Sequence, residues 1–286
     1  MKKLFERLIV FFVGFPLLLS LVIFFPQNNH LLLNLTITVF AVLGAVEFRN
    51  ILSKKFLVIS APEAAIFGAV SPAAWILVIS FGLPEAIVIA GFMLCASWLL
   101  VSRLFTKNVE KLDSYLSILT TGLAVLIYPG LFMAWVIRMA ALSEASWIIL
   151  TFFLLTLLND AFAWASGMLF GKNNRGIFAA SPNKSIAGFT GGLTASLLAG
   201  IAATILLPNA FTSSWMPSTL AGAILGLAVG VASILGDLGE SAIKRSAGVK
   251  DSGSLVLGRG GALDSIDSVA LAAPVFFILY QILFLK

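Results

Sequence analysis

Residues 147–170 read WIILTFFLLTLLNDAFAWASGMLF, a run of 24 residues with one carboxylate, Asp160, and no lysine or arginine. A run of this length and composition can cross about 30 Å of hydrocarbon as a single helix. A carboxylate inside such a span is costly unless it is paired or hydrated, which favours a functional role for Asp160. The stretch therefore predicts a membrane-spanning helix that carries part of a polar site.

The composition of the whole chain agrees with this interpretation. Of its 286 residues, 60% are apolar and only 11% are charged, and the mean hydropathy is +1.06. Soluble domains are nearer half apolar and a quarter charged, so this chain is neither a disordered protein nor a nucleic-acid-binding module. A single cysteine, Cys95, excludes an intrachain disulfide, and a single histidine, His30, excludes a histidine-cluster metal site.

Apolar runs of about 20 residues predict an all-α, polytopic membrane protein with nine transmembrane helices. A tight hairpin at Gly82, Pro84 and Glu85 is needed between the third and fourth spans. The nine predicted spans are Leu8–Phe25, Leu31–Val46, Ala64–Phe81, Pro84–Val101, Tyr115–Ile137, Trp147–Phe170, Gly188–Leu207, Leu220–Leu235 and Val269–Leu285.

The basic residues predict the orientation of these spans. Sixteen of the 18 lysines and arginines fall on one side of the predicted membrane, and only Arg138 and Lys286 fall on the other. Because cytoplasmic loops carry the excess of basic residues, we expect the N-terminus in the cytoplasm and the C-terminus outside. The protein is thus predicted to be a multi-pass protein of the inner (cytoplasmic) membrane, with its active site on the cytoplasmic face.

The two halves of the chain differ in polarity. Residues 1–145 have almost nothing polar in mid-membrane, and are predicted to form a scaffold bundle of five spans and a candidate homodimerisation surface. Residues 146–286 carry Asn159, Asp160 and Asp237, and are predicted to be the catalytic region, with cytoplasmic loops at 171–187 and 237–268. Within that region, glycines four apart, at Gly222, Gly226 and Gly230, are typical of close helix packing.

The richest polar segment follows the eighth span. If that helix continues past Asp237, then Asp237, Glu240, Ser241 and Lys244 share one face, because residues three, four and seven apart do so. Asp264 and Asp267 are likewise three apart at the start of the ninth span.

Between these acids lies a basic, glycine-rich connection. A glycine loop that runs into a helix N-terminus presents free N–H groups that favour a phosphate. Three carboxylates beside four cations suit Mg²⁺ and a polyphosphate. The alternative is a solvated loop with helix-capping residues such as Asp264 or Ser265. The residues concerned are the acids Asp237, Asp264 and Asp267, the glycines Gly258, Gly260 and Gly261, and the cations Lys244, Arg245, Lys250 and Arg259.

This segment resembles the signature of the phosphatidate cytidylyltransferases, in which Ser-x-x-Lys-Arg, Lys-Asp, Pro-Gly-His-Gly-Gly and Asp-Arg-x-Asp follow one another. Asn159-Asp160 and Ser181-Pro-Asn-Lys184 upstream also match, so that the resemblance covers roughly the last 130 residues. The matching residues are Ser241, Lys244, Arg245, Lys250, Asp251, Gly258, Gly260, Gly261, Asp264 and Asp267.

Four residues depart from the family pattern, and one of them is Asn183, which replaces a frequent Lys although Lys184 remains. Leu257 and Arg259 stand where the family usually has Pro and His, and Ser265 stands where it usually has Arg. Because Arg stays protonated, an acid–base role of the family's His does not carry over to Arg259.

The resemblance implies an enzyme that transfers CMP from CTP to phosphatidic acid, giving CDP-diacylglycerol and pyrophosphate, with Mg²⁺ and with a second cation left open. Its implied partners are CTP, phosphatidic acid and membrane lipids, and no nucleic acid. It implies catalytic roles for Asp237, Lys244, Lys250, Asp251, Asp264 and Asp267, with Asp237, Asp264 and Asp267 as metal ligands. It implies substrate contacts for Ser241, Arg245, Gly258, Arg259, Gly260, Gly261, Asn159, Asp160, Ser181 and Lys184.

Two other functions remain alternatives. A CTP-dependent polyprenol or phytol kinase would use similar basic and acidic residues, but its alcohol acceptor normally calls for a general base, for which Asp251 or Asp160 would be needed. A secondary transporter would account for Asp160, but not for charges that gather at one membrane face.

Overall fold

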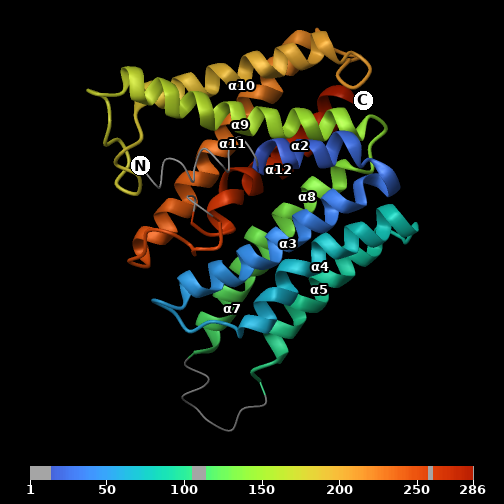
Figure 1. Ribbon diagram of the computed structural model, residues 1–286. Coiled ribbons are helices and arrows are strands. Elements are labelled where there is room, and N and C mark those ends of the chain that lie inside the picture. The colour runs from blue at the N-terminus through green and yellow to red at the C-terminus, as the bar shows by residue number, and fades with distance from the viewer. Residues whose placement is uncertain (1–13, 105–113, 257–259, 286) are drawn as a thin grey trace. The chain divides into compact units, whose positions relative to one another are not determined.

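The computed structural model describes residues 14–104, 114–256 and 260–285, and its regular elements there are helices (Figure 1). Its β-type pairing over these ranges consists of two isolated bridges, Arg175 with Ser185 and Val256 with Gly260. The helices are α2 (Phe15–Phe24), α3 (Gln27–Leu52), α4 (Ala61–Phe81), α5 (Ala86–Val101), α7 (Tyr115–Val125), η2 (Leu126–Leu131), α8 (Phe132–Met139), α9 (Ala145–Phe170), α10 (Ile186–Leu206), α11 (Ser218–Ser246) and α12 (Leu263–Phe284).

Seven helices in the described ranges are long and apolar enough to cross a membrane. They are α3, α4, the continuous run Tyr115–Met139 formed by α7, η2 and α8, and α9 to α12. The prediction of an all-α, polytopic membrane protein is therefore confirmed. The other two predicted spans fall on α5, with 16 residues, and on α2, with 10. Residues 1–13, at the start of the first predicted span, lie outside the described residues, and the count of nine stays a prediction.

Three helices extend at least six residues beyond one end of their predicted apolar runs. α3 continues past Val46 to Leu52, α11 continues past Leu235 to Ser246, and α12 begins at Leu263 rather than at Val269. A span predicted from composition ends where the apolar residues end, whereas the backbone hydrogen bonds of a helix continue into polar surroundings. The connection between α11 and α12 is consequently 247–262, shorter than the predicted loop 237–268.

The chain forms two compact units. The first contains the described residues up to Ala141 together with Ser246–Ile266, and the second contains Leu142–Arg245 and the residues from Asp267 onward. In the first unit α3 and α4 pack side by side, as Gly68 lies against the Ala41 carbonyl and the Ala45 methyl (Figure 1). Small residues on both helices thus let the two backbones approach each other closely.

A capping box begins α4 in the first unit. Ser60 Oγ accepts the Glu63 N–H at 3.3 Å, and Glu63 Oε2 accepts the Ser60 N–H at 2.8 Å. The indole of Trp98 donates to Glu63 Oε1 at 2.9 Å, and Arg103 pairs with Glu63 Oε2 at 3.2 Å. The first turn of α4 therefore also anchors the C-terminal end of α5.

The second unit is built on small residues and aromatic rings. α9 packs along α10, and α10 touches α11 through Gly200, Gly222 and Gly226, as predicted from the glycine spacing. Phe152 on α9 lies 5.3 Å from Phe276 on α12, measured between ring centroids. This packing fixes α11 and α12, the helices that carry Asp237 and Asp267.

We predict that the Gly226→Ala substitution destabilises the protein, because the added Cβ would overlap the Ser196 carbonyl of α10. Overpacking of this kind costs about 1–3 kcal/mol. Gly239→Ala is the matched control on the same helix, since a Cβ there meets nothing within 4 Å. Thermal unfolding in detergent should show a lower Tm for Gly226→Ala and an equal or higher Tm for Gly239→Ala. Equal losses in both variants would contradict the packing described for α10 and α11.

Candidate active site

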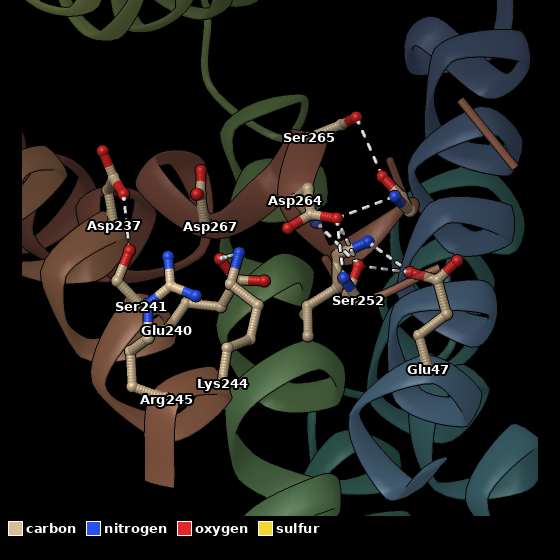
Figure 2. A network of polar contacts seen from close by, with 12 residues as sticks. Glu47, Asp237, Glu240, Ser241, Lys244, Arg245, Ser252, Asp264, Ser265 and Asp267 are labelled. Atoms are coloured by element: carbon tan, nitrogen blue, oxygen red, sulfur yellow. Dashed lines mark hydrogen bonds and ion pairs between the residues drawn. The ribbon is translucent and has the colours of Figure 1, made fainter. Parts of the chain in front are cut away.

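The continuation of α11 to Ser246 brings four predicted residues together on one face. Ser241 Oγ donates to Asp237 Oδ1 at 3.4 Å one turn away, and Lys244 Nζ pairs with Glu240 Oε2 at 2.6 Å. Figure 2 shows these side chains on the same stretch of helix. The predicted spacing of three, four and seven residues is confirmed as a continuous polar face.

The Glu240–Lys244 ion pair is buried. The side chain of Glu240 is 0% exposed and that of Lys244 is 11% exposed. Lys244 was predicted to hold phosphate, and its buried position beside Glu240 shows that it also balances a charge of the protein itself. Glu240 was assigned no role from the sequence, although its spacing of four residues from Lys244 is typical of an ion pair on a helix.

A second ion pair joins α11 to the loop between α9 and α10. Lys184 Nζ lies 2.6 Å from Asp237 Oδ2, and Arg245 Nε donates to the Ala180 carbonyl at 3.4 Å. This loop ends at Ser185, which caps α10 because its hydroxyl accepts the Gly188 N–H at 3.0 Å. Ser181 is half-buried in the same loop, where its N–H donates to the Phe178 carbonyl.

Carboxylates gather where α11 meets α12. Asp267 interacts electrostatically with Asp237, Glu240 and Asp160. Gly236 permits the close approach, because a Cβ at this position would overlap the Asp267 carbonyl oxygen. The structure thus brings together Asp237 and Asp267, two of the three predicted metal ligands.

Asp160 belongs to a polar patch on α9. The buried Asn159 donates through Nδ2 to Asp160 Oδ1 at 3.4 Å, and Ser196 on α10 donates to Asn159 Oδ1 at 3.4 Å. The predicted polar pair within this span therefore packs against the same helix that positions α11.

The donor set fits a magnesium ion that is completed by a substrate. Among the described residues no group of three or more His, Cys, Asp or Glu side chains is arranged to hold a metal by itself. Mg²⁺ is usually held by one or two carboxylates, with water and substrate phosphates filling its remaining positions. Asp237 and Asp267 meet this requirement.

A separate polar network lies in the first unit, around Ser252 (Figure 2). Asp264 Oδ2 accepts from the Ser252 N–H at 2.9 Å, from the Ser252 hydroxyl at 2.8 Å and from the Gly261 N–H at 2.8 Å. Glu47 Oε2 on α3 accepts from the Ser252 hydroxyl at 3.0 Å and from the Leu263 N–H at 2.8 Å. Asp264 therefore organises the connection before α12, and its predicted part in metal binding stays a prediction.

The glycine connection is held by internal hydrogen bonds. The Gly260 N–H donates to the Val256 carbonyl at 3.0 Å, and the Gly261 N–H donates to Asp264. Gly260 has a φ of +113°, a conformation that favours glycine. These two N–H groups were predicted to donate hydrogen bonds to a phosphate. To do so, they would have to give up the hydrogen bonds that they make here. Lys250 and Asp251 are exposed, while Gly258 and Arg259 lie outside the described residues.

Sequence reasoning missed Glu47. It follows directly after the predicted end of the second span at Val46, where charged residues are ordinary. The one feature of the sequence that could have indicated Glu47 is its position as a carboxylate directly after an apolar run.

Comparison with known proteins assigns the family. The Cytidylyltransferase family matches residues 5–283, and the chain belongs to this family. It is 40% identical over 129 residues to the phosphatidate cytidylyltransferase of Synechocystis sp., covering 43% of this chain and 42% of that protein. It is 30% identical over 206 residues to the phosphatidate cytidylyltransferase of Mycobacterium bovis, covering 68% of this chain and 64% of that protein. It is also 35% identical over 162 residues to the uncharacterized protein YnbB of Escherichia coli, covering 52% of each. The chain thus spans between about two-fifths and two-thirds of these relatives.

We predict that Lys244→Met destabilises the protein more than Lys184→Met. Removing one partner of a buried ion pair costs about 3–5 kcal/mol, whereas a solvent-exposed pair contributes about 0–1 kcal/mol, and the more exposed Lys184–Asp237 pair lies between these two cases. The side chains of Lys184 and Asp237 are 24% and 33% exposed. Thermal unfolding should therefore give the larger loss for Lys244→Met, and a second change, Glu240→Gln, should recover much of it. Equal losses for the two lysine variants would argue against the buried pair.

Proposed function

We propose that this protein is a phosphatidate cytidylyltransferase, which transfers CMP from CTP to phosphatidic acid and releases pyrophosphate. The observation that carries the proposal is the group of carboxylates with its two lysine ion pairs at the ends of α11 and α12. Membership of the Cytidylyltransferase family and the printed names of the relatives support it.

The main difficulty of this reaction is the repulsion between its two negatively charged substrates, rather than the removal of a proton. The oxygen of the lipid phosphate attacks the α-phosphorus of CTP, and the bond to the bridging oxygen of the departing pyrophosphate breaks. A phosphate monoester is already largely ionised near neutral pH, with a second pKa of about 6, so a strong base is not needed. The two polyanions repel each other instead, and positioning and charge neutralisation must supply most of the catalysis.

The proposal gives each part of the site one task. Asp237 and Asp267 would hold Mg²⁺, which would supply positive charge to neutralise the phosphate oxygens. Lys184 on the α9–α10 loop and Arg245 on α11 hold the anionic substrates at the helix ends. Ser241 fixes the orientation of Asp237 through its hydrogen bond. A second cation and a direct part for Lys250 and Asp251 stay predictions.

The proposed topology places this chemistry at the cytoplasmic side of the inner membrane, where CTP is available. It rests on the basic residues, sixteen of which fall on the side of the α9–α10 and α11–α12 connections. In this arrangement the chain has nine spans, its N-terminus lies inside and its C-terminus lies outside.

An apolar groove between α11 and α12 is the proposed place for one acyl chain of the lipid. Its lining includes Leu227, Val231 and Leu235 on α11 and Leu271 and Val275 on α12. Leu271 and Val275 follow Asp267 at steps of four residues, so the same face of α12 leads from the groove to the carboxylate. An acyl chain in this groove would place the phosphate of its lipid near Asp267.

We predict that Asp237→Asn and Asp267→Asn each lower the transfer rate by about 100-fold or more, because each removes a ligand of the proposed metal. The assay combines radiolabelled CTP, phosphatidic acid and Mg²⁺ in detergent micelles. Glu85→Gln, a change at an exposed carboxylate before α5, should leave the rate unchanged.

The products of the same assay separate the proposed function from its alternatives. CDP-diacylglycerol and pyrophosphate support the proposal. CDP and a phosphorylated lipid alcohol would indicate a kinase, and substrate uptake into sealed vesicles without nucleotide turnover would indicate a transporter. Either of the last two results would overturn the proposed function.

We predict that Val231→Trp raises the KM for phosphatidic acid by about 10-fold, because excluding two methylene groups from the groove costs about 1.6 kcal/mol. The KM for CTP should not change. Leu198→Trp is the matched control, because Leu198 is exposed on α10 and does not line the groove. An unchanged lipid KM for Val231→Trp would exclude the groove as the acyl site.

A further inference from the structure

Glu47 is a carboxylate of the N-terminal half that reaches the connection before α12. It lies on α3, five residues before the end of the helix at Leu52. Its Oε2 accepts from the Ser252 hydroxyl at 3.0 Å and from the Leu263 N–H at 2.8 Å. Both contacts lie within the first unit, and they join segments more than 200 residues apart in the sequence.

The connection is built closely around this carboxylate. A Cβ at Gly253 would lie against Glu47 Oε1, and a Cβ at Gly261 would overlap both Glu47 Oε2 and the Ser252 hydroxyl. Larger residues at these two positions would therefore displace Glu47. The glycines make room for a side chain of another helix as well as for a turn of the loop.

Ser252 couples Glu47 to Asp264. Its hydroxyl carries one hydrogen but lies within hydrogen-bond distance of both carboxylates, at 3.0 Å from Glu47 Oε2 and 2.8 Å from Asp264 Oδ2. The same oxygen also accepts the Asp264 N–H at 3.3 Å. A change in the charge or orientation of Glu47 must therefore change how Ser252 holds Asp264 (Figure 2).

We propose that Glu47 is a positioning residue for CMP transfer. By holding Ser252 and the first N–H of α12, it fixes the start of this helix and, through Ser252, the side chain of Asp264, a predicted metal ligand. Glu47 acts through these residues and does not touch the substrates. The inference rests on the proposed function, because it concerns the rate of that reaction.

Glu63 offers a matched control for a purely structural role. It too is a carboxylate of the first unit that accepts a backbone N–H and a serine hydroxyl near the start of a helix, α4. Its loss should weaken a helix cap without reaching the α11–α12 connection.

The kinetic test compares Glu47→Gln, Ser252→Ala, the double variant and Glu63→Gln in the micelle assay. We expect kcat to fall about 10-fold or more in Glu47→Gln, as for other residues that orient metal ligands, with both KM values within about twofold. The double variant should be no slower than the slower single variant, because both changes break one chain of contacts. Glu63→Gln should lower Tm and leave kcat within about twofold. An unchanged kcat in Glu47→Gln, or additive losses in the double variant, would overturn the proposal.

Amide hydrogen exchange gives a readout that does not depend on activity. In Glu47→Gln the N–H groups of Gly261 and Leu263 should exchange about 10-fold faster than in the unchanged protein, since their tether is weakened. Unchanged exchange would show that Glu47 does not hold the connection. If the unchanged protein lacked CMP transfer altogether, the proposed function would fail, and the positioning role for transfer would fail with it, whereas faster exchange alone would still establish the tether.

Discussion

The electrostatic repulsion between Asp267 and its neighbours Asp237, Glu240 and Asp160 is the constraint on which the rest of the site depends. Like charges close together at the end of membrane helices are unfavourable unless cations offset them. Lys184 and Lys244 offset part of this charge through ion pairs of 2.6 Å. The glycine at position 236 nevertheless brings α11 directly against Asp267. This close packing of carboxylates supports the proposed cation site, and a substrate that brings its own phosphates would share the proposed cation.

Contacts within each unit hold the helices and the connection on which the polar residues lie. In the second unit, the contact of α10 with α11 through glycines and the aromatic contact of α9 with α12 hold the two acidic helices in place. In the first unit, Glu47 and Asp264 hold Ser252 and the backbone that leads into α12. Asp264 and Asp267 lie one turn apart on that helix, so its first turns carry residues of both networks.

Much of the fold follows from the sequence, because apolar runs of membrane length have few alternatives to a helix. The polar face of α11 could also be predicted, since residues three and four apart meet on any helix. Glu47 could not, because its partners Ser252 and Leu263 are 205 and 216 residues away, and no local periodicity marks such a contact. The glycine loop shows a further limit: its composition predicted free N–H groups, but those of Gly260 and Gly261 already bind Val256 and Asp264.

The most direct test of this account is the binding of Mn²⁺, as a paramagnetic substitute for Mg²⁺, to the purified protein with CTP, followed by electron paramagnetic resonance. The account predicts a protein-bound Mn²⁺ signal that depends on CTP and disappears when Asp237 and Asp267 are both changed to Asn. An equally strong bound signal in that double variant would contradict it.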